Sequence, residues 1–136
     1  MRGAPAVALA LFLAACATPG QRPASCPPDL SPVTTAELYF GRDIGGTLGV
    51  SEDDWRAFLD AEVTPRFPDG LSVTDVAGQW RGADGVIVRE PSKALLLILS
   101  GAPGEADRIA AIRAAYRARF HQEAVLLLRR QGCAAF

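Results

Sequence analysis

The alternation of apolar and polar residues predicts four β-strands after residue 33. Residues 34–43 are rich in β-branched and aromatic side chains, and residues 71–80 alternate as a half-buried strand does. An Asp-Gly pair then marks a turn, which makes residues 86–100 the second strand of a hairpin. The apolar run within residues 123–136 predicts the last strand.

Two other segments repeat their apolar residues every three to four positions, as amphipathic helices do. Ser51 followed by Asp54 resembles a capping box and predicts the start of the first helix, which ends before Pro65. Residues 102–120 predict the second helix. The apolar faces consist of Trp55, Phe58, Leu59 and Val63 in the first helix and of Ile109, Ile112, Tyr116 and Phe120 in the second.

The order β-α-β-β-α-β predicts an α+β, ferredoxin-like domain, with two helices on one face of a four-stranded antiparallel sheet. The first and third strands are then central, which suits the continuous apolar run of residues 95–99. The last strand also lacks a polar face over residues 125–128, so the sheet face away from the helices needs a cover. A homodimer through this face, or the segment that precedes the domain, would supply it.

Two stretches depart from these regular patterns. Pro91 lies within the second strand of the hairpin and predicts a bulge or an edge there, because proline cannot donate to a ladder. Residues 44–50 are rich in glycine but lack the Lys-Ser/Thr pair of a phosphate-binding loop, so we expect this loop to supply flexibility.

Residues 1–16 have the features of a lipoprotein signal peptide. Arg2 precedes an apolar run over residues 6–15 that is too short to span a bilayer. The sequence Leu-Ala-Ala before Cys16 resembles a bacterial lipobox, so we expect export and membrane anchoring through lipid on Cys16. Ala17 in place of Asp favours the outer membrane, on the periplasmic side. A plain cleavable signal peptide is the alternative.

Residues 17–33 are rich in proline and predict an extended tether, and residues 34–136 form one domain. In an oxidising compartment Cys26 and Cys133 would form a disulfide between the tether and the last strand. Two free thiols are the alternative.

Composition excludes several classes of function. The formal net charge of −1 gives no electrostatic reason to expect nucleic-acid binding. The chain has no Cys-x-x-Cys pair and only one histidine, which argues against a redox enzyme and a metal site. No cofactor is expected. Lys93 is the single lysine among fourteen basic residues, a hint that a compact ammonium matters there.

Several motifs resemble those of a domain-of-unknown-function family of small exported bacterial proteins, often predicted to be lipoproteins. They are ELYFGR, VSEDDWRAFLDAEVTPRFPDGLSV, GQWR, IVREPSKALLL and AIRAAYRARFHQEAVL, and together they span residues 37–128. The resemblance implies an exported single domain and supplies no reaction.

The candidate ligand-binding residues lie in four places along the chain: Arg66 after the first helix, Trp80 before the hairpin turn, Glu90 and Lys93 around Pro91, and His121 after the second helix. Glu90 and Lys93 could bind an anion or do acid–base chemistry if desolvated, or could be a surface ion pair. His121 could instead cap its helix, and Trp80 could anchor the core or a rim.

Arg66 is the one residue of its turn that the local pattern leaves unexplained. We hypothesise that its guanidinium reaches a carboxylate, either Asp69 nearby or Glu90 across the hairpin. Two functions remain open. The first is a non-catalytic envelope module for binding or interaction. The second is a small cofactor-free enzyme of the dimeric α+β barrel type, with a pocket between sheet and helices lined by Trp80, Glu90, Lys93 and Arg66.

Overall fold

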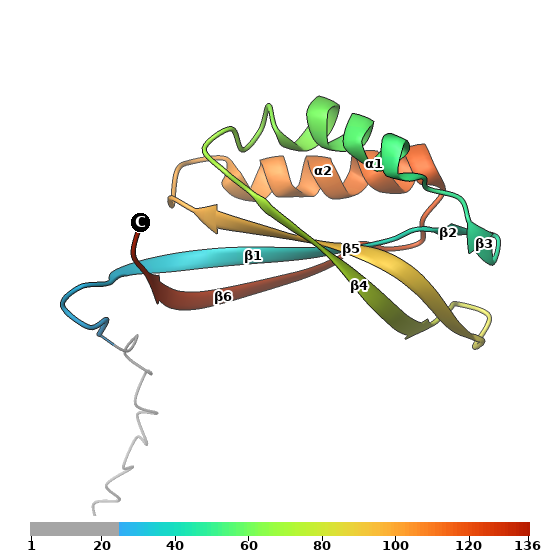
Figure 1. Cartoon of the computed structure of the whole chain (residues 1–136), viewed down its shortest axis with the longest axis horizontal. Helices are drawn as coiled ribbons and strands as arrows, with labels where there is room; N and C mark the ends of the chain where they lie inside the picture. The colour runs from blue at the N-terminus through green and yellow to red at the C-terminus, as the bar shows by residue number, and fades with distance from the viewer. Residues whose placement is uncertain (1–24) are drawn as a thin grey trace, which may run out of the picture.

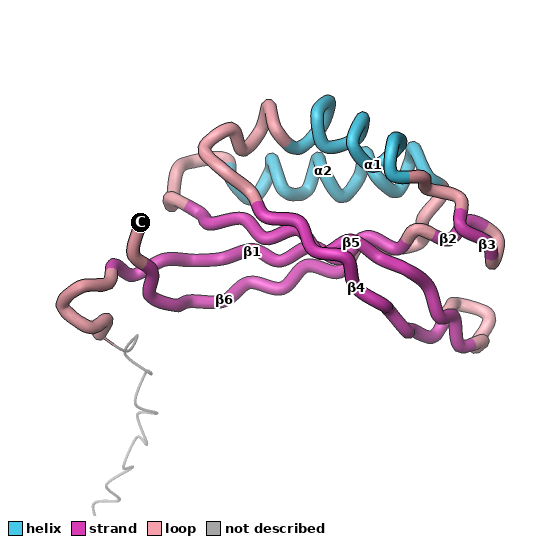
Figure 2. Tube along the Cα trace, in the orientation of Figure 1, coloured by secondary structure: helices cyan, strands magenta, loops and turns pink. Residues whose placement is uncertain are grey.

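The computed structural model describes residues 25–136 and has the predicted order of elements (Figure 1). Four strands form one antiparallel sheet in the order β4-β5-β1-β6: β1 (Ser31–Gly41), β4 (Ser72–Arg81), β5 (Ile87–Leu99) and β6 (Leu126–Ala134). The helices α1 (Glu52–Phe58), η1 (Leu59–Val63, a π-helix) and α2 (Glu105–Phe120) lie on one face of this sheet (Figure 2). The ferredoxin-like fold is therefore confirmed, with β1 and β5 central as expected.

Five aromatic side chains form the centre of the core between the helices and the sheet: Phe40, Trp55, Phe58, Tyr116 and Phe120. The Phe40 ring centroid lies 4.7 Å from that of Tyr116 and 5.1 Å from that of Trp55. The buried Tyr116 hydroxyl donates to the Gly41 carbonyl over 2.8 Å, and burial raises the pKa of this phenol. This hydrogen bond attaches the end of β1 to α2.

The first helix does not continue as one regular α-helix. Its last turn is η1, in which the Thr64 N–H donates to the Leu59 carbonyl over 2.8 Å. A π-turn has more residues per turn, so a side chain five positions on returns to nearly the same face. Phe58 and Val63 are five residues apart and both are fully buried. The wider turn thus extends the apolar face up to Pro65.

Two local predictions need correction. Residues 44–50 contribute to a short hairpin of β2 (Asp43–Ile44) and β3 (Thr47–Leu48) rather than only a flexible loop. Strand β5 pairs with β4 without a bulge, and Pro91 lies opposite Ala77. Its carbonyl accepts from the Arg42 N–H just after β1 ends. The edge interpretation of Pro91 is correct, because its nitrogen lies on the side where the β1 ladder stops.

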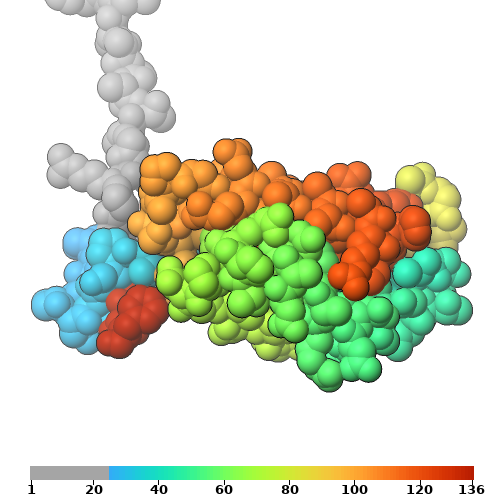
Figure 3. Space-filling view, turned by 90° about the horizontal axis from the view of Figure 1, so that it is seen from above, coloured from blue at the N-terminus to red at the C-terminus, as the bar shows by residue number. Residues whose placement is uncertain are grey.

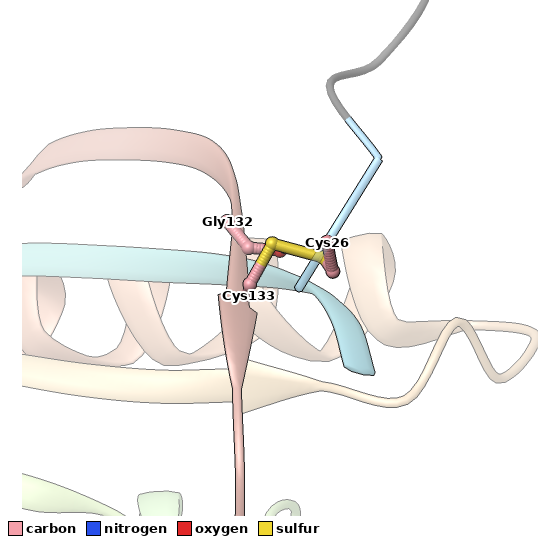
Figure 4. The surroundings of a disulfide bond; sticks show 3 residues. All are labelled: Cys26, Gly132 and Cys133. Atoms are coloured by element: carbon pink, nitrogen blue, oxygen red, sulfur yellow. A yellow bond between two sulfur atoms is a disulfide. The ribbon is translucent and has the colours of Figure 1, made fainter. Parts of the chain in front are cut away.

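The predicted disulfide is present between Cys26 and Cys133, with an S–S distance of 2.06 Å and a Cα–Cα distance of 5.7 Å (Figure 4). Cys133 lies opposite Pro32 in the pairing of β6 with β1. The bond therefore joins the segment before β1 to the end of the last strand. The predicted signal peptide, Cys16 and residues 17–24 of the predicted tether lie outside the described residues, and β1 begins at Ser31, within residues expected to belong to that tether.

No helix in the described part of the chain is long and apolar enough to cross a membrane. Seen from above in the space-filling view, α1 and α2 cover the sheet (Figure 3). The opposite face of the sheet has no helix over it in Figures 1 and 2.

A buried carboxylate organises the start of α2. Glu105 is 7% exposed and accepts hydrogen bonds from the Ser100 N–H and hydroxyl, both over 2.9 Å, and from the Gly101 N–H over 3.2 Å. Burial alone would raise the pKa of this carboxyl, but the hydrogen bonds from Ser100 and Gly101 outweigh it and lower the pKa. Glu105 thus holds the turn that follows β5.

We predict that Glu105→Gln lowers the free energy of unfolding by about 1–3 kcal/mol at pH 7, since it weakens hydrogen bonds to a charged group. A lowered folded-state pKa stabilises the fold above the ordinary carboxyl pKa, and this stabilisation is lost as the pH falls through the folded-state value. The difference between the two proteins should therefore shrink in acid, as urea unfolding at pH 7 and at about pH 3 would measure. An equal difference at both pH values would contradict this assignment.

Candidate functional site

Side chains alternate between the two faces of the sheet, and this alternation separates the candidate residues. On β5, Leu95 and Leu97 are buried under the helices, so odd-numbered residues such as Lys93 belong to the helix-covered face. Even-numbered residues such as Glu90 and Ser92 belong to the opposite face, which we call the open face. Glu90 and Lys93 are therefore not a pair, and the predicted pocket combining them is wrong.

Lys93 lies in an ion cluster at the start of α1. Its side chain is 5% exposed, and its Nζ donates to Glu52 Oε2 over 2.9 Å and to Asp75. Glu52 also accepts from Arg42 Nη1 over 2.6 Å. The Arg42 side chain, 8% exposed, donates from Nε to the Val50 carbonyl over 2.9 Å. Glu52 thus bridges two buried cations, Lys93 of β5 and Arg42 directly after the end of β1.

This cluster keeps all of its charges. Burial would lower the pKa of Lys93, but the hydrogen bonds and charges of Asp75 and Glu52 outweigh it and raise the pKa. The hydrogen bond from Lys93 lowers the pKa of both carboxyl groups. An amine whose pKa is raised above its ordinary value remains protonated at neutral pH and cannot act as a base there. The geometry gives Lys93 a structural role.

The open face has a pocket of about 320 Å³ at the end where β4 and β5 extend beyond the helices. Its lining includes two aromatic residues, one carboxylate, one hydroxyl and two glutamines, Gln79 and Gln122, beside small and apolar residues. The members used below are Tyr39, Gly78, Trp80, Glu90, Ser92 and Leu126. Trp80 and Leu126 are 37% and 55% exposed. A second hollow of about 580 Å³ lies at the other end of the same face, beside Ile98 and Phe136.

Two glycines make room for the polar groups of this pocket. A Cβ on Gly41 would clash with the Glu90 carboxylate, which crosses β1 at that point and accepts from the Asp43 N–H over 3.1 Å. A Cβ on Gly78 would lie 3.0 Å from the Ser92 hydroxyl. Glu90 and Ser92 therefore sit in places that only glycine on the adjacent strands leaves free. The sequence showed these glycines without showing which side chains cross them.

The remaining candidates lie apart from the pocket. Arg66 pairs with Glu62 Oε2 over 2.9 Å and donates to the Glu62 carbonyl over 2.6 Å, so the hypothesis of a contact with Asp69 or Glu90 is wrong. The i,i+4 spacing of Glu62 and Arg66, which spans the end of the helix, was the signal for this pair. His121 is exposed and ends α2 in the left-handed conformation, with φ of 53°, so the cap interpretation fits its geometry.

Comparisons with known proteins identify the fold and a family. The sequence model of a family described as "Protein of unknown function (DUF3574)" matches residues 35–136. No curated protein matches the chain. A phage SAM lyase in complex with S-methyl-5'-thioadenosine is similar in structure, with a TM-score of 0.61, 17% identity and coverage of 76% of this chain and 90% of that one.

The same phage enzyme in its apo state has a TM-score of 0.56 and 18% identity, over 77% of this chain and 90% of that one. CutA from Synechococcus elongatus has a TM-score of 0.49 and 11% identity, over 76% of this chain and 80% of that one. At these identities the likeness to the lyase shows the fold alone.

We predict that Lys93→Met lowers the free energy of unfolding by about 1–3 kcal/mol, because it keeps the buried stem and removes hydrogen bonds between charged groups. The matched control is Arg56→Met, which breaks the exposed ion pair with Asp53 and should change stability by less than about 0.5 kcal/mol. Urea unfolding of both variants makes the comparison. Equal effects would show that the buried cluster does not stabilise the fold.

Proposed function

Because the chain belongs to the DUF3574 family, whose function is unknown, we propose its function from the structure itself. We propose an exported, lipid-anchored and non-catalytic binding module of the bacterial envelope, which presents the open face of its sheet. The observation that carries the proposal is the pocket on that face, where Trp80 forms part of an uncovered wall beside the Glu90 carboxylate and the Ser92 hydroxyl.

The disulfide supports the exported location. Bonds such as Cys26–Cys133 persist in oxidising compartments and are rare where thiols are kept reduced. The lipobox-like sequence before Cys16 supports anchoring, since a cysteine lipidated at a new N-terminus holds a protein on a membrane. The pocket is then displayed towards the periplasm, from the outer membrane.

The charge state of Lys93 supports a non-catalytic role. The amine that the sequence singled out is fully engaged with Glu52 and Asp75 on the helix-covered face. The open-face pocket contains one carboxylate and no basic side chain, so it lacks a matched acid and base within reach of each other. Binding requires only shape and complementary polarity, which the pocket provides.

We predict that Cys16→Ala moves the protein out of the membrane fraction, because the lipid that would anchor it can no longer be attached. The measurement is fractionation of the cell envelope together with labelling by a radioactive fatty acid. Cys26→Ser is the control, since it removes a different cysteine and should leave the lipid in place. Unchanged membrane association of an unlabelled Cys16→Ala protein would contradict lipid anchoring.

A second candidate function is the small enzyme of the dimeric α+β barrel type. One observation favours it: Ile98 and Leu126 on the open face are 40% and 55% exposed, and a homodimer through this face would bury both, Leu126 at the pocket and Ile98 at the other end of the face. Such a dimer would enclose Glu90 and Ser92 in a chamber protected from water, where acid–base chemistry becomes stronger.

Native mass spectrometry of residues 17–136, purified from an oxidising compartment, separates the two candidates. For the binding module we predict a monomer that is two hydrogens lighter than the reduced chain, because the disulfide closes and the open face stays free. A dimer that Leu126→Glu converts to a monomer would support the enzyme and contradict the binding module.

A further inference from the structure

We propose that the open-face pocket binds a small organic cation, namely an amine or quaternary ammonium group carried on an aromatic or apolar body. This inference rests on the proposed function, because it assigns a ligand class to the same face. Three features of the pocket support it: the charge of Glu90, the oxygens of Glu90 and Ser92 that accept no hydrogen bond from a described residue, and the aromatic rings of Trp80 and Tyr39.

The only ionised side chain in the pocket lining is negatively charged. Glu90 is its one carboxylate, and the lining contains no lysine, arginine or histidine. Within the described residues Glu90 forms no ion pair. The nearest arginines in the hairpin, Arg81 and Arg89, face away because they occupy the odd-numbered positions of β4 and β5. A cationic ligand in this pocket would therefore meet one carboxylate and no competing cation of the lining.

The Glu90 carboxylate is positioned by one of its oxygens, while the other accepts no hydrogen bond from a described residue. Glu90 Oε2 accepts from the Asp43 N–H over 3.1 Å, and Gly41 leaves space for the group to lie across β1. No hydrogen bond to Oε1 is formed by any described residue. The position of the charge is therefore fixed by the backbone, while one oxygen faces no protein donor. This preorganisation reduces the entropy lost on binding.

Ser92 provides a second acceptor beside the carboxylate. The residue is 7% exposed and its hydroxyl forms no hydrogen bond in the described part of the chain. Ser92 follows Glu90 by two residues on β5, so both side chains lie on the open face. The Ser92 hydroxyl is close to Gly78 of β4. The hydroxyl is open to the pocket, and a primary ammonium group carries three donors that could reach both Ser92 and Glu90.

Two aromatic rings complete the arrangement. Trp80 and Tyr39 contribute to the pocket, and a cation over the face of such rings is attracted by their quadrupole. The Tyr39 hydroxyl donates to Glu37 Oε2 over 3.0 Å, and this hydrogen bond raises the pKa of Tyr39, so its ring stays neutral. The volume of about 320 Å³ limits the ligand to roughly one ring with a short chain.

The test is isothermal titration calorimetry of the full chain in nonionic detergent, with three probes of equal shape: phenethylamine, phenethyl alcohol and 3-phenylpropionate. We expect the amine to bind at least about tenfold more tightly than the alcohol, a difference of about 1.4 kcal/mol in binding free energy. We expect the carboxylate to show no binding. Glu90→Gln should weaken the amine about tenfold while leaving the alcohol unchanged.

Two further variants locate the effect. Trp80→Leu should weaken the amine more than the alcohol, because it removes the ring that attracts the charge. Glu62→Gln, which removes a carboxylate paired with Arg66 outside the pocket, should leave all three probes unchanged. Circular dichroism spectra of the variants check that each is folded before its affinity is compared.

The outcomes separate this inference from the proposed function. Equal binding of amine and alcohol, unaffected by Glu90→Gln but weakened by Trp80→Leu, would overturn the cationic ligand and leave a binding pocket on the open face. If Glu62→Gln weakens binding of the amine as much as Glu90→Gln does, the amine is attracted to carboxylates in general. That result would overturn a specific cation site at Glu90. No binding of any probe would also overturn it, whereas the proposed function is tested separately, by the oligomeric state and by the lipid anchoring at Cys16.

Discussion

The structure depends on the burial of one aromatic cluster against one face of the sheet. Phe40 of β1 contacts Trp55, Phe58 and Tyr116, which brings both helices to the same side. Burial of large aromatic side chains is among the strongest contributions to a small core. Because all of this cluster lies on one face, the other face of the sheet receives no helix and must interact with solvent, a ligand or another chain.

The two faces treat their charges differently. Under the helices, Lys93 and Arg42 both pair with Glu52, and Lys93 also pairs with Asp75, so two carboxylates face two cations. On the open face, Glu90 is positioned by a backbone N–H and has no cation among the described residues. A carboxylate that the backbone positions and that no protein cation pairs with is available to a ligand, whereas the charges around Lys93 already have partners. This contrast makes the open face the candidate for function.

Much of the fold follows from the sequence because hydrophobic periodicity has different values in strands and helices. The continuous apolar run around Leu97 identified a central strand, and the two cysteines outside the signal peptide identified the disulfide. The candidate site was harder. Side chains alternate between the faces of a strand, so the odd spacing of Glu90 and Lys93 already places them on opposite faces. This could have been predicted from the sequence. The contact of Glu52 with Lys93 could not, since the two residues are 41 positions apart and only the tertiary fold joins them.

The central claim is that the open face is free in solution, and the two tryptophans test it within one sample. Trp80 on the open face is 37% exposed and Trp55 in the core is 3% exposed. In the ¹H–¹⁵N spectrum of residues 17–136, a soluble paramagnetic agent should broaden the Trp80 indole resonance strongly and leave that of Trp55 sharp. Protection of Trp80 to the same extent as Trp55 would mean that another chain or the preceding segment covers this face, and would contradict the account.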